Sequence, residues 1–419
     1  MHPGTLLDLA SDLLRRVRKF DAPADAVVSA FFREHRQLGQ RERATLAETT
    51  YCFLRKRLLF EYLSRGGSGV IERRLAILGW AGSEMSLLGV LAPPERAWFE
   101  QTKAVDRASL PESLRHNLPD WLAQALRDQL GADEFWHLVA ALYSAAPLDL
   151  RVNTLKAKRD DVRAALREAG VQSEPTRYSP WGLRVGGKPA IGRLDVFTRG
   201  DIEVQDEGSQ LLALLTDARR GEMVVDFCAG SGGKTLALGA AMRDTGRLYA
   251  FDTSAHRLDA LKPRLARSGL SNVYPTQITH ERDERIQRLH GKTDRVLVDV
   301  PCSGLGTLRR NPDLKWRQTP QSIDELRVRQ LAILTSAAHL LKSGGRLVYA
   351  TCSLLRAENE QVVSEFDAAC PEFGPMPVVE VLARARCTDA ESVADGRFLH
   401  LWPHRHGSDG FFAAVWVRK

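Results

Sequence analysis

The chain has 419 residues, of which 44% are hydrophobic and 26% charged, a composition typical of a globular protein with more than one domain. Its net charge of +7 favours an anionic partner, because lysine and arginine side chains attract phosphate groups. No apolar run approaches the roughly 20 residues that span a bilayer, and the first residues do not resemble a secretion signal. We therefore expect a cytoplasmic protein without a membrane segment.

The cysteines are not arranged as metal ligands. None belongs to a Cys-x-x-Cys pair or lies at zinc-finger spacing from histidines, and the six are Cys52, Cys228, Cys302, Cys352, Cys370 and Cys387. We expect no structural metal and no disulfide framework. Cysteines within apolar segments usually act as small packing residues, and we expect this of Cys52, Cys370 and Cys387.

Three regions follow one another along the chain. Residues 1–145 have apolar positions three and four apart, which predicts an all-helical domain. Residues 146–203 combine a strand-like stretch with a helix that ends at Gly170, which predicts a small α/β module. Residues 204–419 alternate strands and helices, which predicts a parallel sheet with crossover helices, an α/β fold of Rossmann-like type.

The helical region contains a basic cluster, Arg55, Lys56 and Arg57. Such a cluster is typical of a solvated helix face. It is equally typical of a contact with an RNA backbone.

A glycine-rich turn joins a buried strand to a helix in the sequence VVDFCAGSGGKT, residues 224–235. Glycines let the backbone approach a ligand closely, and Asp226 ends the strand before the turn. Asp252 ends the next strand, where a carboxylate can accept hydrogen bonds from both ribose hydroxyls. These features predict a nucleoside cofactor. A phosphate-binding loop is disfavoured because its first glycine would fall on Cys228, and the dinucleotide pattern does not fit either.

Two further strands end in cysteine motifs. The sequence LVDVPCSGLG carries Asp299 and Cys302, and YATCSLLRAENE carries Cys352. Because ligands bind beyond the carboxyl ends of parallel strands, we expect both thiols beside the cofactor. A thiolate that adds to carbon 6 of cytosine makes carbon 5 nucleophilic. Lys234 would favour the thiolate, and Asp299 could hydrogen-bond the base.

At these motifs the sequence resembles the RsmB/NOP/NSUN family of RNA 5-methylcytosine methyltransferases, and most closely its bacterial ribosomal RNA branch. The resemblance spans residues 204–419, including the terminal DGFFAAVWVRK. More loosely, residues 146–203 resemble the family's small RNA-facing domain and residues 1–145 its NusB-like RNA-binding domain. The resemblance implies a class I methyltransferase fold, S-adenosyl-L-methionine as cofactor and RNA as partner, ribosomal RNA first and transfer RNA second. We expect a monomer.

The resemblance also implies roles for single residues. Cys352 would be the nucleophile, and Cys302 would assist release of the methylated RNA; DNA cytosine methyltransferases use the Pro-Cys cysteine for attack, so the reverse order stays open. Asp299 would contact cofactor and base, and Lys234 would lie in the active site. The cofactor would contact Cys228, Ala229, Gly230, Ser231, Gly232, Gly233, Lys234, Asp252 and Asp299.

Two positions depart from the family pattern. The family usually has Ala-Pro-Gly-Gly where this chain has residues 230–233, Gly-Ser-Gly-Gly, which predicts a looser loop. The adenine-contacting aspartate of the family falls on His280, which is either an uncharged replacement or a surface histidine without a role.

Two alternatives remain at this stage. The chain could be a catalytically silent RNA-binding or ribosome-assembly factor, although the retained cysteines argue against this. Methylation of another acceptor is disfavoured because no Asn-Pro-Pro-Tyr-like loop is present. A basic segment after Cys302 is either a solvated loop or a surface that meets phosphate and stacks a base; it contains Arg309, Arg310, Lys315, Trp316 and Arg317.

Overall fold

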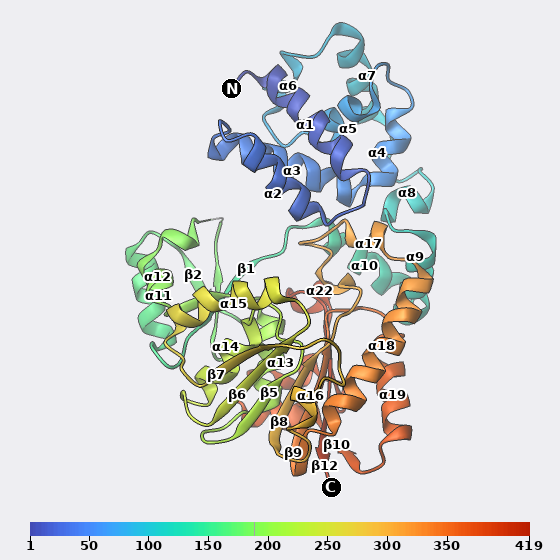
Figure 1. The fold of residues 1–419 in the computed structure, drawn as a ribbon. Helices are drawn as coiled ribbons and strands as arrows, with labels where there is room; N and C mark the ends of the chain where they lie inside the picture. The colour runs from blue at the N-terminus through green and yellow to red at the C-terminus, as the bar shows by residue number, and fades with distance from the viewer. Residues whose placement is uncertain (188) are drawn as a thin grey trace. The chain divides into compact units, whose positions relative to one another are not determined.

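The structure, a computed structural model, describes residues 1–187 and 189–419 (Figure 1). The chain divides into two compact units. We call residues 1–144 with 308–319 the helical unit, and residues 145–307 with 320–419 the sheet unit.

The helical unit contains α1 (Pro3–Val17), α2 (Ala24–Glu34), α3 (Gln40–Arg55), α4 (Arg57–Ser64), α5 (Ile71–Gly79), α6 (Glu84–Leu88), α7 (Pro93–Ala104), α8 (Glu112–His116), α9 (Asp120–Leu130), α10 (Ala132–Tyr143) and α17 (Leu314–Arg317). The first helix begins with a proline at its first position, where no backbone N–H is needed, and the His2 side chain accepts from the Gly4 amide. Its apolar stripe packs against α3 and α5, so that Leu7, Leu13 and Phe53 are fully buried. Across the described ranges no helix is long and apolar enough to cross a membrane.

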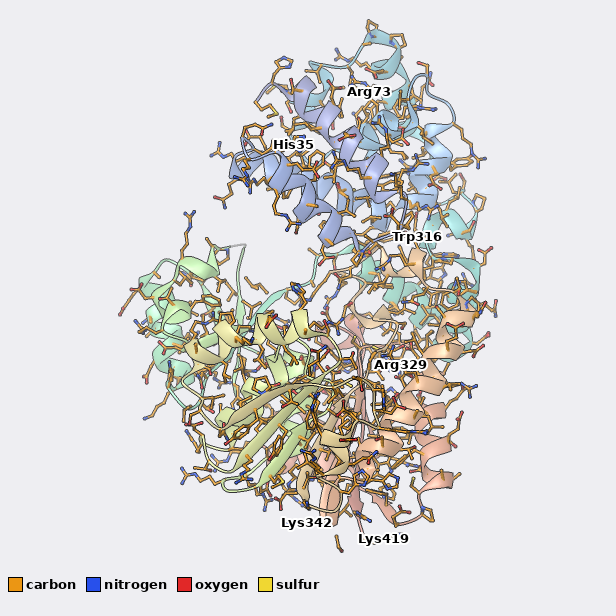
Figure 2. The ribbon with its side chains drawn as sticks, viewed as in Figure 1. His35, Arg73, Trp316, Arg329, Lys342 and Lys419 are labelled. Atoms are coloured by element: carbon orange, nitrogen blue, oxygen red, sulfur yellow. The ribbon has the colours of Figure 1, made fainter. Side chains whose placement is uncertain are left out.

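Two members of the predicted basic surface after Cys302, Lys315 and Trp316, make their contacts inside the helical unit. Lys315 is 5% exposed and donates to the Arg55 carbonyl over 3.0 Å, and the Trp316 indole donates to the Leu54 carbonyl over 2.8 Å. Figure 2 labels Trp316, which packs against the core of the helical unit. Burial, with the nearby Arg55, lowers the pKa of Lys315 to about 7. The N–H of Trp316 and part of its ring are thus engaged inside the unit, and stacking on a base stays a prediction.

The basic cluster of α3 and α4 is also largely satisfied internally. Arg55 pairs with Glu48 at 3.0 Å, and Arg57 pairs with Glu61 at 3.0 Å while lying over the Trp316 ring. Partially buried ion pairs of this kind hold the helix junction in place. The two sequence interpretations, a solvated helix face and a contact with an RNA backbone, both stay predictions for this cluster.

A small antiparallel sheet opens the sheet unit. Its strands lie in the order β2-β3-β1-β4, with bounds β1 (Leu148–Val152), β2 (Ser173–Pro175), β3 (Gly182–Val185) and β4 (Ile202–Val204). It is accompanied by α11 (Arg159–Glu168), η1 (Ile191–Arg193) and α12 (Asp195–Thr198). Val162 and Leu166 of α11 pack with Leu150 and Leu183 in a separate small core, as expected for an α/β module.

The large sheet confirms the predicted α/β fold. Its strands lie in the order β10-β12-β9-β8-β5-β6-β7, and β11 pairs with β12. Neighbours from β7 to β9 are parallel, whereas β12 is antiparallel to β9. The strands are β5 (Met223–Asp226), β6 (Arg247–Asp252), β7 (Val273–Gln277), β8 (Thr293–Asp299), β9 (Leu341–Thr351), β10 (Phe373–Pro375), β11 (Phe398–Leu401) and β12 (Phe411–Arg418).

Helices cover both faces of this sheet. One face buries Leu212 of α13 and Leu236 of α14, and the other buries Leu334 of α18 and Phe366 of α19 (Figure 1). Both faces of the strands are therefore apolar, as is usual for parallel sheets. The helices and short turns are α13 (Glu207–Thr216), α14 (Gly233–Ala241), α15 (Ala255–Ser268), α16 (Glu284–Gln287), η2 (Leu305–Thr307), α18 (Pro320–Ala338), α19 (Glu360–Ala369), α20 (Val378–Arg384), α21 (Ala390–Val393) and α22 (Pro403–His406).

The strand order reverses at β5. The chain continues from β5 to β6 and β7 on one side, and then returns to β8 and β9 on the other. In open parallel sheets such a reversal leaves a crevice beyond the carboxyl ends of the strands. The predicted functional motifs follow these carboxyl ends.

Candidate active site

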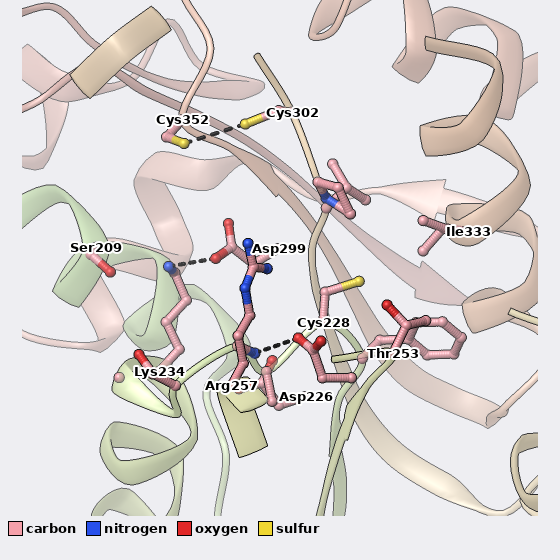
Figure 3. A pocket seen from close by; sticks show the side chains of 18 of the residues that line it. Ser209, Asp226, Cys228, Lys234, Thr253, Arg257, Asp299, Cys302, Ile333 and Cys352 are labelled. Atoms are coloured by element: carbon pink, nitrogen blue, oxygen red, sulfur yellow. Dashed lines mark hydrogen bonds and ion pairs between the residues drawn. The ribbon is translucent and has the colours of Figure 1, made fainter. Parts of the chain in front are cut away.

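A cavity of about 720 Å³ lies at the carboxyl ends of β5, β6, β8 and β9 (Figure 3). This size suits a ligand as large as a nucleoside cofactor. The predicted residues that line it are Cys228, Ala229, Gly230, Ser231, Gly233, Lys234, Asp252, His280, Asp299, Cys302 and Cys352. Asp226 lines it too, whereas Gly232 is buried beneath the loop and does not.

The turn before α14 requires its glycines. Gly230 and Gly232 have φ values of 56° and 83°, which favour glycine. A Cβ on Gly232 would lie 2.1 Å from a methyl carbon of Leu261, so the residue also permits α15 to pack closely. The loop is thereby shaped to present its backbone to the cavity.

Asp252 is placed to receive hydroxyl groups. It is buried, and each of its carboxylate oxygens accepts one backbone N–H, from Gly230 at 2.8 Å and from Ser254 at 2.7 Å. Each oxygen retains further acceptor capacity. The arrangement fits a ribose diol.

Asp226 has one carboxylate oxygen without a partner. Its Oδ2 accepts from the Thr235 hydroxyl over 2.7 Å, while Oδ1 is buried and accepts no hydrogen bond from the described residues. Burial raises the pKa of Asp226 to about 7, against the opposing hydrogen bond from Thr235. A buried acceptor at a cavity wall is satisfied by a ligand that donates a hydrogen bond or carries positive charge, which fits a sulfonium nucleoside with an amino group.

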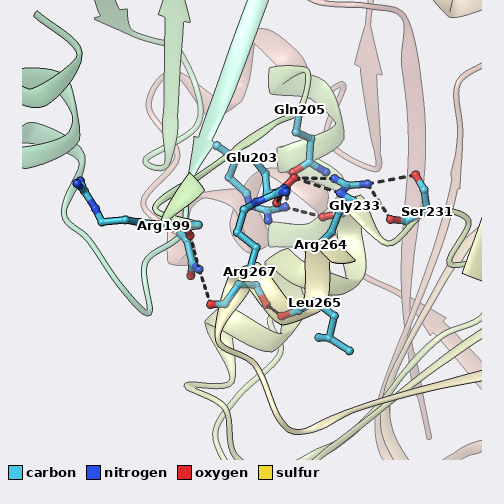
Figure 4. A network of polar contacts seen from close by, with 12 residues as sticks. Arg199, Glu203, Gln205, Ser231, Gly233, Arg264, Leu265 and Arg267 are labelled. Carbon is cyan, nitrogen blue, oxygen red and sulfur yellow. Dashed lines mark hydrogen bonds and ion pairs between the residues drawn. The ribbon is translucent and has the colours of Figure 1, made fainter. Parts of the chain in front are cut away.

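Arginines of the sheet unit brace the loop where the family usually has proline. Arg264 donates to the Ser231 carbonyl over 2.7 Å and to its hydroxyl over 3.2 Å, and pairs with Glu203 at 3.0 Å (Figure 4). The buried Arg151 of β1 donates to the Gly233 carbonyl over 2.5 Å. These contacts restrain a loop that composition alone predicts to be loose.

Lys234 and Asp299 form an ion pair in the cavity. Their charged atoms are 2.7 Å apart, and both side chains are largely buried (Figure 3). Burial lowers the pKa of Lys234, but Asp299 outweighs this through charge and hydrogen bonding, so that the pKa is raised overall. The ammonium group also interacts electrostatically with Cys352. Lys234 therefore carries a positive charge on the wall of the cavity.

The two motif cysteines meet above this ion pair. The sulfur atoms of Cys302 and Cys352 are 3.3 Å apart (Figure 3). The hydrogen bond with Cys352, together with burial, raises the pKa of Cys302 well above its ordinary value. Either sulfur can be the donor in this contact, and the raised pKa favours the Cys302 thiol as the donor.

Sequence reasoning missed several cavity residues, among them Gln205, Ser209, Arg257 and Arg329. In Figure 3 the Arg257 side chain extends from α15 toward the middle of the cavity. No signal identifies it, because an arginine on an amphipathic helix ordinarily faces solvent. His280, which was predicted, lies exposed at the rim, and its Nδ1 accepts from the Arg282 amide over 3.1 Å.

Comparison with known proteins decides the family. Residues 213–417 match the family model "16S rRNA methyltransferase RsmB/F", and residues 118–191 match the ferredoxin-like domain model "Methyltr_RsmF/B-like". The "Probable ribosomal RNA small subunit methyltransferase B" of Synechocystis is 36% identical over 339 residues, which cover 80% of this chain and 74% of that protein. The chain belongs to the RsmB/F family of RNA methyltransferases. The predicted resemblance is confirmed.

Solved structures share the fold of this chain. PH0851 superposes on the whole chain with a TM-score of 0.81 at 26% identity, covering 100% of this chain and 99% of that one. NSun6 from Pyrococcus horikoshii, solved with SFG, an analogue of S-adenosylmethionine, has the same fold, with a TM-score of 0.62 at 20% identity over 72% of this chain and 98% of that one. RsmB/F enzymes depend on S-adenosylmethionine, which is the cofactor of this chain.

Proposed function

We propose that this enzyme methylates carbon 5 of a cytosine in RNA, with Cys352 as a covalent nucleophile. The observation that carries the proposal is the contact between the Cys302 and Cys352 sulfur atoms on the wall of the cofactor cavity. Transfer to a nitrogen or oxygen acceptor needs no thiol, whereas carbon 5 of cytosine becomes reactive only after a nucleophile adds to carbon 6.

The residues divide the chemistry between them. S-adenosylmethionine supplies an electrophilic methyl group when it is bound. The Cys352 thiolate adds to carbon 6, and electron density reaches carbon 5, which takes the methyl group. Lys234 brings a positive charge to the wall of the same cavity. Asp299, held by Lys234 at 2.7 Å, is placed to hydrogen-bond the ring nitrogen and amino group of the base.

Cys302 acts in the last step. Once carbon 5 carries both the methyl group and its original proton, that proton must leave and the bond from carbon 6 to the Cys352 sulfur must break. A water molecule takes that proton, the electron pair left behind forms the double bond between carbons 5 and 6, and the Cys352 sulfur departs as a thiolate. Cys302 is the group that lies beside the breaking bond, and we assign its thiol to assist this release by donating a hydrogen bond to the departing sulfur. The reverse assignment, attack by Cys302, is disfavoured because the pKa of this thiol is raised by its bond to Cys352 and by burial.

The cofactor is held by the turn and the strand ends. We assign its contacts to residues 228–234, to Asp252 through the ribose hydroxyls, and to Asp299 near the reacting methyl group. His280 stands at the rim and is the candidate for the adenine. Buried Asp226 would receive a donor through its unpartnered Oδ1.

The substrate assignment is ribosomal RNA, with transfer RNA as the second candidate. Relatives named as ribosomal RNA small subunit methyltransferases support the first. We propose that residues 1–145 are a NusB-like RNA-binding domain, residues 146–203 an RNA-facing module and residues 204–419 the methyltransferase domain. The enzyme would act as a monomer in the cytoplasm, where ribosomal RNA is found in bacteria.

The test is product analysis. The purified chain is incubated with methyl-labelled S-adenosylmethionine and small-subunit ribosomal RNA, which is then digested to nucleosides. Labelled 5-methylcytidine is the expected product, and bisulfite sequencing of the same RNA locates it. A labelled adenosine or uridine derivative would overturn the proposal. RNA binding without any transfer would instead indicate the catalytically silent assembly factor.

A further inference from the structure

Glu358 is a buried carboxyl group that the proposed chemistry does not use. It is 0% exposed and is absent from the wall of the cavity. Its oxygens accept hydrogen bonds from the Ser303 amide at 2.8 Å, the Ser303 hydroxyl at 2.6 Å, the Gln330 side chain at 2.9 Å and the Ser353 hydroxyl. A buried carboxyl group is costly unless donors surround it, and here four donors do.

Three of these four donors belong to the two cysteine loops, and the fourth, Gln330, lies on α18. Ser303 follows Cys302 directly, and Ser353 follows Cys352 directly. One carboxyl group therefore joins the Pro-Cys-Ser loop after β8 to the Thr-Cys-Ser loop after β9. The serine hydroxyls are also within 3.2 Å of each other.

Glu358 is itself held firmly in place. The Tyr349 hydroxyl of β9 donates to the Glu358 carbonyl over 2.6 Å. The neighbouring Asn359 accepts from the Thr351 hydroxyl over 2.6 Å and donates to the Ser353 carbonyl over 3.1 Å. The segment after Cys352 thus folds back onto the end of its own strand, and the carboxyl group has a fixed position from which to hold the other loop.

We propose that Glu358 is a positioning residue that clamps the two loops together and thereby keeps the Cys302 and Cys352 sulfur atoms in contact. The inference rests on the proposed function for its consequence: separated sulfurs would slow release of the methylated base more than formation of the adduct. The clamp itself is a statement about the distance between two thiols, and it can be measured without any methyl transfer.

Phenylarsine oxide is the probe. Its trivalent arsenic forms two As–S bonds with a pair of thiols and releases water, without any change of oxidation state. Tight binding requires both sulfurs at once, because the second bond is intramolecular. The wild-type chain is expected to bind one equivalent tightly, and Cys302→Ser and Cys352→Ser each to lose that binding, which identifies the pair against the other cysteines.

Glu358→Ala is expected to weaken phenylarsine oxide binding by at least about tenfold, because the second As–S bond then closes from separated loops. Glu358→Gln is expected to stay within about threefold of wild type, since its amide can accept from Ser303 N and Gln330 and donate to the two hydroxyls. Glu207→Ala is the matched control: it removes another buried carboxyl group of the sheet unit, which accepts from the amides of Tyr178 and Ser179. It should leave the thiol pair intact.

A second variant tests the clamp if the Glu358→Ala chain does not fold. The double variant Ser303→Ala, Ser353→Ala removes the two hydroxyl donors with little change in volume, and it should also weaken phenylarsine oxide binding. Thermal melting and S-adenosylmethionine binding establish that each variant is folded. Folded variants that bind phenylarsine oxide as tightly as wild type would overturn the clamp.

The two proposals fail separately. If the wild-type chain made no 5-methylcytidine yet Glu358→Ala lost phenylarsine oxide binding, the clamp would stand and the proposed function would fall. If the wild type methylated cytosine and Glu358→Ala slowed adduct formation and release equally with the thiol pair unchanged, the clamp would fall alone.

Discussion

The sulfur atoms of Cys302 and Cys352 lie 3.3 Å apart although the residues are fifty positions apart in the chain. They meet because β8 and β9 are parallel neighbours, with Asp299 opposite Ala350. Cys352 follows the end of β9 directly, and Cys302 follows the end of β8 after Val300 and Pro301. Because the two thiols are in contact, one can form a bond to the base while the other lies next to that bond. Variants of single residues can separate these two roles and can test the contacts that hold the site together.

Replacing Cys302 by alanine should trap the enzyme on ordinary RNA. Attack and methyl transfer remain available to Cys352, but release lacks its nearest group, so turnover should fall by at least about a hundredfold while a covalent RNA complex accumulates. A denaturing gel with labelled RNA detects the complex. The same complex from Cys352→Ala, and none from Cys302→Ala, would reverse the roles.

Lys234→Met should slow the first turnover. It removes the positive charge beside Cys352 and leaves Asp299 without its partner, and we expect at least a tenfold lower single-turnover rate, roughly 1.4 kcal/mol of barrier. Lys342→Met is the control, since Lys342 pairs with Asp294 near the opposite end of β8. Equal effects of the two variants would mean that the ion pair serves stability alone.

Arg264→Ala should weaken cofactor binding. Without its hydrogen bonds to Ser231 the glycine-rich loop loses a brace, and we expect about a tenfold higher Kd for S-adenosylmethionine by calorimetry, with Arg264→Lys in between. Lys262→Ala, on the same helix and paired with Asp259 in solvent, should bind normally. An unchanged Kd in Arg264→Ala would show that Ser231 needs no support.

Gly306→Ala should destabilise the fold. A Cβ there would lie 2.0 Å from the Gly410 carbonyl oxygen and 2.8 Å from that of Cys352, and backbone atoms cannot move aside cheaply. We expect a loss of about 1–3 kcal/mol in the free energy of unfolding, the range for overpacked sites. Gly192→Ala, which meets nothing within 4 Å, is the matched control and should be near neutral. A neutral Gly306→Ala would contradict the close approach of the two loops.

Asp226 should make stability depend on pH. Its pKa is about 7 in the folded chain and near 3.8 when exposed, so between these values the folded state binds more protons and its stability falls as pH rises. Asp226→Asn lacks this titration. Measured by urea unfolding without cofactor, the variant should gain stability relative to wild type from pH 5 to pH 8, by at most about 1.4 kcal/mol per pH unit. A pH-independent difference would show that Asp226 titrates normally.

The sequence predicts the parts of the site that are local. Strand-end motifs identify Asp252, Asp299 and Cys352, because the carboxyl ends of parallel strands converge whatever the details of packing. Arg264 could not be predicted, because its role depends on which loop lies across from α15. The packing of Trp316 could not be predicted for a related reason: an aromatic residue among arginines has the same pattern whether it meets a base or packs against neighbouring helices. Glu358 belongs to the motif YATCSLLRAENE, which the sequence identifies. Only the structure shows which groups donate hydrogen bonds to its carboxylate.

The most direct test of the covalent mechanism is to trap the adduct on RNA that contains 5-azacytidine and to locate the bond by peptide mass spectrometry. The methylated 5-azacytosine ring has no proton at position 5 to lose, so release is blocked and the enzyme remains attached. The base is expected on the peptide that contains Cys352, with no adduct in Cys352→Ala. Attachment through Cys302, or no covalent species from a chain that still methylates cytosine, would contradict the mechanism.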